Sequence, residues 1–113
     1  MKQIIAVIQP HMLGKVEHAL HALPRFPGFT LLRAKGQARG RAPGHAFQAT
    51  EWDLDERDKI SLLIVSSDEL APQIVDAIEH NAHTGLPGDG IIVVSEASEV
   101  VRIRTGERGQ DAV

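Results

Sequence analysis

The order of apolar segments constrains the fold of this chain more than any other feature. Short apolar runs rich in β-branched residues, which are typical of buried strands, occur at Ile4–Ile8, Ile60–Val65 and Ile91–Val94. Phe29–Arg33 is a further strand candidate after the turn at Pro27-Gly28. Apolar residues recur at helical spacing in two other segments, formed by Leu13, Val16, Leu20 and Leu23, and by Leu70, Ile74, Ala77 and Ile78.

These segments follow the order strand, helix, strand, a long gap, and then strand, helix, strand. That order predicts an α+β, ferredoxin-like βαββαβ fold with a long loop between strands 2 and 3. A chain of 113 residues fits a single domain, which we expect to span residues 1–113.

Boundary residues refine this prediction. Pro24 should end the first helix, and Ser66-x-x-Glu69 matches a capping box that would begin the second. Val100–Ile103 is expected to form a fifth, short strand.

Composition argues against several classes of protein. The chain has no cysteine, which excludes disulfides and thiolate metal sites. Its formal net charge of -3 and its four aromatic residues disfavour nucleic-acid binding. The N-terminal apolar run is too short for a signal peptide or a membrane span. We therefore expect a cytoplasmic protein that binds no nucleic acid and does not insert into a membrane.

The segment Gly36–Asp58 is unusually long for a connection between two strands. Loops of this length in compact domains are uncommon and are often functional. Its first half carries Arg39 and Arg41, whereas its second half is acidic. This polarity suits a docking arm for a partner, and a solvated hairpin without a role is the alternative.

A glycine-rich loop, HTGLPGDG, spans residues 83–90. Its three glycines allow positive φ angles and close approach to a ligand, and successive N–H groups in such loops bind anions. Asp89 could accept a hydrogen bond from a ribose or an ammonium group. A plain connection between a helix and a strand is the alternative.

Two arginines near the C-terminus, Arg102 and Arg104, are two residues apart. In a strand they would lie on the same face, where two guanidinium groups suit phosphate oxygens. An exposed pair that balances the acidic surface is the alternative.

The chain has six histidines, some of which could bind a metal ion. His18 and His21, like His80 and His83, have the i, i+3 spacing that can place two ligands on one helix face, and His45 lies in the long loop. Each pair would need a third ligand, and solvated surface histidines are the alternative. No nucleophile elbow, Walker A sequence or Cys–His pair is present, so we do not expect an enzyme.

Three longer segments together resemble the PII family of nitrogen-regulatory signalling proteins. They are MKQIIAVIQP at the start, HTGLPGDGIIVV, and EVVRIRTGERGQDAV at the end. The resemblance covers nearly the whole chain and implies a homotrimer. It also implies a T-loop at residues 37–58, a nucleotide loop at 83–90 and a C-terminal segment at 100–113.

The resemblance further implies a non-catalytic signalling protein that binds an adenine nucleotide (ATP, ADP or AMP) in clefts between subunits. The nucleotide would bias the T-loop, through which a partner transporter or enzyme is regulated. The residues carried over to this site are Val7, Thr30, Gly36, Arg39, Lys59, Val65, Thr84, Gly88, Asp89, Gly90, Arg102 and Arg104.

Three positions depart from the family pattern. Gly40 replaces a glutamine and offers no side-chain oxygen, so we do not expect the usual response to Mg²⁺ and 2-oxoglutarate. Ile91 replaces a phosphate-binding lysine, which favours ADP or AMP over ATP. Trp52 replaces a tyrosine that is modified in some members and is a candidate docking anchor, with packing on the chain's own surface as the alternative.

A different class of function stays open. A trimeric metal-binding protein of similar fold, acting in metal homeostasis, would use His18, His21, His80 or His83. A scaffold that has lost ligand binding is a third hypothesis, favoured by Gly40 and Ile91.

Overall fold

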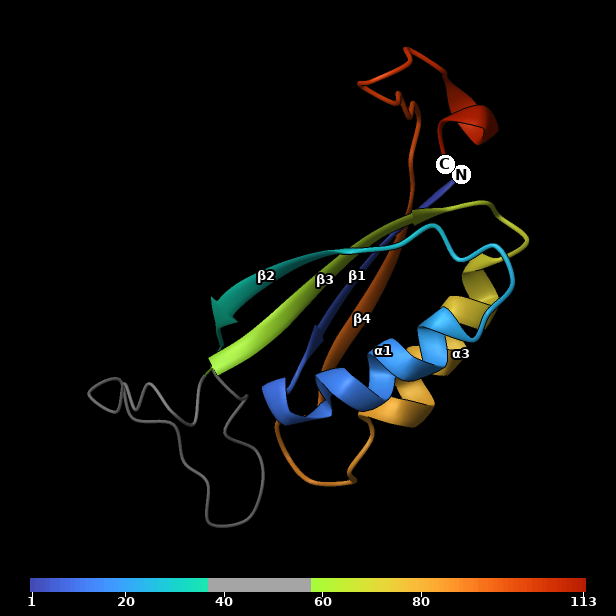
Figure 1. Cartoon of the computed structure of the whole chain (residues 1–113). Helices are drawn as coiled ribbons and strands as arrows, with labels where there is room; N and C mark the ends of the chain where they lie inside the picture. The colour runs from blue at the N-terminus through green and yellow to red at the C-terminus, as the bar shows by residue number, and fades with distance from the viewer. Residues whose placement is uncertain (37–57) are drawn as a thin grey trace.

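The computed structural model describes residues 1–36 and 58–113. Its main elements, in chain order, are β1 (Lys2–Ile8), α1 (Leu13–His21), β2 (Thr30–Lys35), β3 (Asp58–Ser66), α3 (Ala71–Ala82) and β4 (Gly90–Glu96) (Figure 1). Short 3-10 helices cover Pro10–Met12 and Gly109–Ala112. This order confirms the predicted βαββαβ fold. In the described part of the chain, no helix has the length and apolar character needed to cross a membrane.

The four strands form one antiparallel sheet in the order β2-β3-β1-β4. The register places Ile4 opposite both Ile64 of β3 and Val94 of β4. Both helices lie on the same face of this sheet (Figure 1). The fold therefore has two layers, with the core between them.

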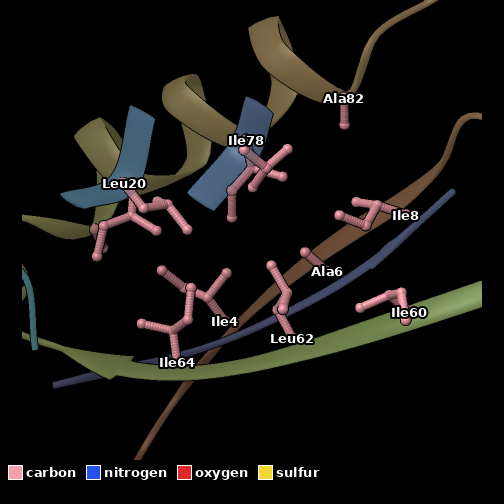
Figure 2. Close-up of a cluster of buried hydrophobic side chains, with 12 residues drawn as sticks. Ile4, Ala6, Ile8, Leu20, Ile60, Leu62, Ile64, Ile78 and Ala82 are labelled. Atoms are coloured by element: carbon pink, nitrogen blue, oxygen red, sulfur yellow. The ribbon is translucent and has the colours of Figure 1, made fainter. Parts of the chain in front are cut away.

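The core is built from alternate residues of the central strands, as the two-residue period of a strand requires. Ile4, Ala6 and Ile8 of β1 point toward the helices (Figure 2). The remaining buried members of the cluster are Ile60, Leu62 and Ile64 from β3, Val16 and Leu20 from α1, and Ala71, Ile74, Ile78 and Ala82 from α3. Burial of these side chains supplies the main favourable contribution to folding.

The opposite face of the sheet is apolar but is not covered by any described element. The alternate residues of the same strands point to it, among them Ile5, Leu32 and Val93, whose exposed fractions are 37%, 56% and 47%. Apolar side chains gathered on one exposed face are typical of a surface that contacts another protein.

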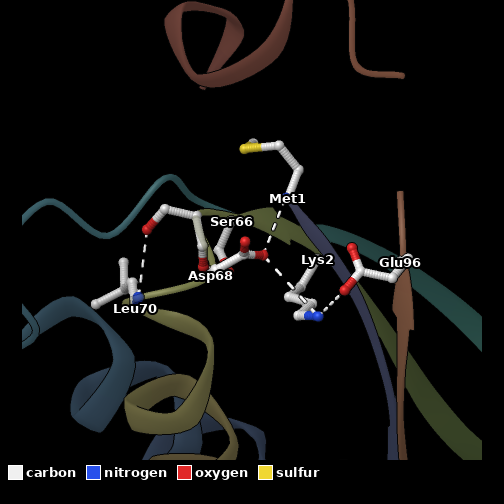
Figure 3. A network of polar contacts seen from close by, with 7 residues as sticks. Met1, Lys2, Ser66, Asp68, Leu70 and Glu96 are labelled. Carbon is white, nitrogen blue, oxygen red and sulfur yellow. Dashed lines mark hydrogen bonds and ion pairs between the residues drawn. The ribbon is translucent and has the colours of Figure 1, made fainter. Parts of the chain in front are cut away.

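The predicted capping box is wrong. Strand β3 continues to Ser66, which pairs with Lys2 and is buried, so its side chain does not reach the helix start. Instead, the N–H of Leu70 donates a hydrogen bond to the hydroxyl of Ser67 over 3.3 Å (Figure 3). This bond lies in the turn before the helix, since α3 begins at Ala71 and Leu70 at its N-cap position makes no side-chain hydrogen bond.

The predicted fifth strand is also wrong. β4 ends at Glu96 opposite Lys2, where β1 begins, so the sheet offers no partner to the residues that follow. Residues 100–108 instead fold back on themselves, with a single bridge between Val101 and Arg108. The N–H of Gly106 donates to the carbonyl of Arg102 over 2.7 Å, closing a turn. Arg102 and Arg104 therefore do not share one face of a strand.

Ion pairs fasten the beginning of β1 to its neighbours (Figure 3). The amino group of Met1 lies 2.9 Å from the carboxylate of Asp68, and Lys2 pairs with Glu96 of β4. The hydrogen bond from the amino group lowers the pKa of Asp68, and the hydrogen bond to Glu96 raises the pKa of Lys2. The carboxylates of Asp68 and Glu96 are exposed to solvent, so each pair contributes little to stability.

Candidate functional site

The sheet has two distinct ends, and the predicted site residues are divided between them (Figure 1). At one end, here called the loop end, β1 and β2 finish and β3 and β4 begin. At the other, here called the terminal end, β1 begins and β4 leads into the C-terminal segment. Each end gathers a different part of the predicted site.

The 83–90 loop at the loop end is organised from within by Asp89. Its carboxylate accepts hydrogen bonds from the N–H groups of Thr84 and Gly85, over 2.8 and 3.0 Å, and from the Thr84 hydroxyl. Burial acts to raise the pKa of Asp89, but these hydrogen bonds and the nearby His83 ring outweigh it and hold the pKa below its usual value. The carboxylate is thus already engaged in shaping the loop.

Glycine is required at two positions of this loop by backbone geometry. Gly88 and Gly90 have φ angles of +95° and +111°, which side chains rarely tolerate. A Cβ atom at Gly90 would also overlap the carbonyl oxygen of Val7. These glycines let the loop turn tightly into β4 directly against β1.

Lys59 joins the 83–90 loop to the neighbouring strands. Its ammonium group donates a hydrogen bond to the carbonyl of Gly88 over 2.8 Å. Its aliphatic stem passes Gly36, where a Cβ atom would lie 3.3 Å from Cγ of Lys59. The predicted residues Gly36, Lys59 and Gly88 are therefore brought together.

Gln9 belongs to the same cluster but was not predicted. Its amide nitrogen would lie 3.3 Å from a Cβ atom at Gly88. Its position in the sequence could have indicated a role in the site, because it is a polar residue between the first buried strand and Pro10.

Val7 also lies at the loop end, on the uncovered face of the sheet. It lies opposite Ile91 of β4 and Ser61 of β3 in the strand register. The side chain of Ile91 is 62% exposed there. Seven predicted residues thus lie at the loop end, namely Val7, Gly36, Lys59, Thr84, Gly88, Asp89 and Gly90.

The remaining described site residues lie toward the terminal end. Thr30 pairs with Leu63 of β3, and Val65 follows two residues further along the same face. Val65 is four residues from Ser61, the partner of Val7, which corresponds to about 13 Å along the strand.

The arginines belong to this end because they follow β4 into the C-terminal segment. The Nε group of Arg102 donates a hydrogen bond to the carbonyl of Ala112 over 2.8 Å, and Arg104 is exposed. Arg39, together with Gly40, Arg41, His45 and Trp52, lies outside the described residues.

The described histidines are not gathered around a common point. His21 contacts the ring of Phe26, with the centroids 5.5 Å apart, and lies 3.9 Å from the carboxylate of Glu17. The Nδ1 atom of His80 is 2.7 Å from the carbonyl of Asp76. In residues 1–36 and 58–113, no group of three histidine or carboxylate side chains could hold a metal ion.

A hollow of about 430 Å³ on the described surface lies beside the terminal end, where its lining includes Ser66, Gln110 and Val113. None of the predicted site residues lines it. Within one chain, the described site residues thus fall into two separate groups at opposite ends of the sheet.

Comparisons with known proteins agree with the fold and extend over the whole chain. The family model described as Nitrogen regulatory protein P-II matches residues 1–107. A nitrogen regulatory protein P-II from Azospirillum brasilense is 41% identical over all of both chains. The nitrogen regulatory protein P-II 2 from Methanothermobacter thermautotrophicus is 38% identical, over all of this chain and 97% of its own. The chain therefore belongs to the nitrogen regulatory protein P-II family.

Proposed function

We propose that this chain is a homotrimeric signalling protein that binds an adenine nucleotide between neighbouring subunits and regulates a partner protein. The observation that carries the proposal is the division of the predicted site. Its residues lie at two ends of one sheet, so a complete site requires the loop end of one copy and the terminal end of another. The uncovered apolar face, with Ile5, Leu32 and Val93, supplies a surface for that association.

The two half-sites offer complementary chemistry to a nucleotide. At the loop end, the glycine-rich loop presents backbone N–H groups, and Lys59 supplies a positive charge. At the terminal end, Arg102 and Arg104 supply guanidinium groups that bind phosphate oxygens. Val7 from one copy and Thr30 and Val65 from its neighbour would line the space for the base.

Regulation would pass through the T-loop, which begins directly after Gly36 and ends at Asp58. Membership in the P-II family supports a regulatory role, and the relatives named above are nitrogen regulatory proteins. We propose that the chain acts in the cytoplasm on a transporter or an enzyme of nitrogen metabolism, with Trp52 as a docking anchor. We do not include catalysis in this role.

Isothermal titration calorimetry with ATP, ADP and AMP, each with and without Mg²⁺ and 2-oxoglutarate, tests the proposal. We expect binding in the micromolar range, with ADP or AMP preferred over ATP and no dependence on 2-oxoglutarate. The double variant Arg102→Ala with Arg104→Ala should weaken binding about a hundredfold, because two charge-assisted hydrogen-bonding groups are lost.

Arg33→Ala is a matched control, since Arg33 is an exposed arginine on the helix-covered side of β2. It should leave the affinity unchanged. Light scattering on the same samples should give the mass of three chains. Absence of binding for all three nucleotides would refute the proposal, and zinc binding that depends on His18 or His80 would favour the metal-binding alternative.

A further inference from the structure

Arg102 is tied to the C-terminal 3-10 helix of its own chain. Its Nε–H donates a hydrogen bond to the carbonyl oxygen of Ala112 over 2.8 Å. The backbone of Arg102 is fixed as well, because its N–H donates to the carbonyl of Glu107 over 2.8 Å and its own carbonyl accepts from the N–H of Gly106 over 2.7 Å. In a segment that is otherwise exposed, this side chain therefore has a defined direction.

The acceptor of the hydrogen bond is itself held in place. Ala112 is only 3% exposed, so other atoms of the chain cover it. Its helix, Gly109–Ala112, is fastened at the start, where the N–H of Gly109 donates to the carbonyl of Val100 over 2.9 Å. Gln110 in the same helix lines the hollow beside the end of β3 and the start of α3. The carbonyl of Ala112 is thus a fixed point on the chain and not a loose end.

The hydrogen bond to Ala112 uses one edge of the guanidinium group and leaves another edge open. A guanidinium has five N–H donors in a fixed fork, so it can bind an anion bidentately through Nε and one terminal nitrogen, or through both terminal nitrogens. With Nε engaged, the pair of terminal nitrogens is the edge that stays available for an oxyanion.

The charge of Arg102 is also not neutralised by a nearby carboxylate. The acceptor at Ala112 is a neutral carbonyl. Glu99, in the same segment, pairs with Arg108 instead. Among residues 1–36 and 58–113, no ion pair and no second hydrogen bond engages the side chain of Arg102. An anionic oxygen would form a stronger hydrogen bond with the open edge than a neutral acceptor could.

We propose that the C-terminal 3-10 helix is a positioning element for Arg102. By accepting the bond from Nε, the Ala112 carbonyl holds the guanidinium with its two terminal nitrogens ready for a phosphate oxygen. The entropy of ordering this long side chain is then lost on folding and not on binding, which favours the ligand. The part of this inference that concerns a nucleotide rests on the proposed function, whereas the fixing of Arg102 by the helix does not.

Nitrogen NMR of the arginine side chains in the ligand-free full chain tests the fixing of Arg102. Hydrogen bonding protects an N–H from exchange with water, so the Nε–H of Arg102 should exchange at least about tenfold more slowly than that of the exposed Arg104. The two signals are assigned by their loss in Arg102→Lys and Arg104→Lys. This comparison is made in the wild type, and equal rates for the two arginines would overturn the inference.

A pair of variants links the slow exchange to the helix. Ala112→Asp places a charge at a buried position, which should displace the helix and bring Arg102 to the exchange rate of Arg104. Gln110→Asp adds the same charge at an exposed position of the same helix and should keep the slow exchange. Slow exchange that persisted in Ala112→Asp would show that the helix does not hold Arg102.

Calorimetry with ADP shows whether the defined direction matters for binding. Ala112→Asp should weaken the affinity roughly fivefold, because the guanidinium must then be ordered on binding, whereas Gln110→Asp should leave it unchanged. In an Arg102→Ala background, Ala112→Asp should have no further effect, since the helix acts through Arg102. An equal loss in both backgrounds would overturn the positioning role. If ADP binds none of the proteins, the proposed function fails, while the proton exchange of Arg102 still decides whether the helix holds it.

Discussion

The loop end and the terminal end of the sheet are built in different ways. At the loop end, Asp89, Gly88, Gly90 and Lys59 fix the backbone through hydrogen bonds and close packing. At the terminal end, the segment that follows β4 folds back on itself, and Ile103 within it is 98% exposed.

The comparison shows which of the two ends is held in place by contacts within a single copy. The 83–90 loop is shaped within a single copy, because Asp89 accepts hydrogen bonds from Thr84 and Gly85 and because Gly90 lies directly against Val7 of β1. The terminal end presents arginine and apolar side chains to the outside. In the proposed trimer, a neighbouring copy would complete a site with these side chains.

The most severe test of this comparison substitutes one glycine at each end. Gly90→Ala should lower the free energy of unfolding by more than about 3 kcal/mol, because its Cβ would overlap the Val7 carbonyl at a positive φ. Gly106→Ala should lose only about 1 kcal/mol, since φ is +74° but nothing lies within 4 Å. Urea unfolding measures both, and equal losses would contradict a difference in packing between the ends.

A smaller effect is expected from adding a charge at the loop end. Ile91 lies beside Val7 on the uncovered face, next to the 83–90 loop. Ile91→Lys should tighten ATP binding about tenfold, because a second ammonium group joins Lys59 at the phosphates. Ile91→Met keeps an apolar side chain of similar size and should have the wild-type affinity. Equal affinities for the two variants in calorimetry would show that position 91 does not face the phosphates.

The carboxylate of Asp89 should make a pH-dependent contribution to stability. Its pKa is lowered in the folded protein, so its stabilising effect is complete above about pH 4 and is lost as the pH falls through the lowered value. Asp89→Asn should reduce the free energy of unfolding by about 1 kcal/mol at pH 7, because hydrogen bonds to a charged acceptor are replaced by weaker ones. The gap between the two proteins should close in acid, and a gap independent of pH would contradict this assignment.

The smallest effect is expected at the terminal end, from Asp68. Its pKa is also lowered, chiefly by the hydrogen bond from the amino group of Met1, but the carboxylate is exposed. Asp68→Asn should change stability less than Asp89→Asn, and the change should vanish in about 1 M NaCl, which screens exposed charges. If the Asp68→Asn effect persisted in high salt while that of Asp89→Asn did not, the assignment of a preorganised loop end and a loosely held terminal end would be wrong.

The sequence predicted the elements whose pattern is local. Short apolar runs identified β1, β3 and β4, the segment after the Pro27-Gly28 turn identified β2, and helical spacing of apolar residues identified both helices. The predictions that failed depended on distant partners. Ser66 became part of β3 because Lys2 lies opposite it, and residues 100–103 did not form a strand because β1 ends its pairing at Lys2.

In the candidate site, too, local features could be predicted from the sequence, whereas contacts between distant residues could not. Gly88 and Gly90 could be recognised from the sequence because backbone with a positive φ angle favours glycine. The hydrogen bond from Lys59 to Gly88, and the approach of Gln9, join residues that are far apart in the chain. No periodicity or motif records such a contact, because it arises only when the strands are aligned in the sheet.

The separation of the two half-sites also sets a stoichiometry. In the proposed arrangement each copy turns its loop end to one neighbour and its terminal end to the other, a head-to-tail contact that closes into a ring. The ring then has as many sites as copies, and every copy takes part in two of them. Mixed rings of loop-end mutants and terminal-end mutants would keep an intact site only at the junctions where two unaltered ends meet.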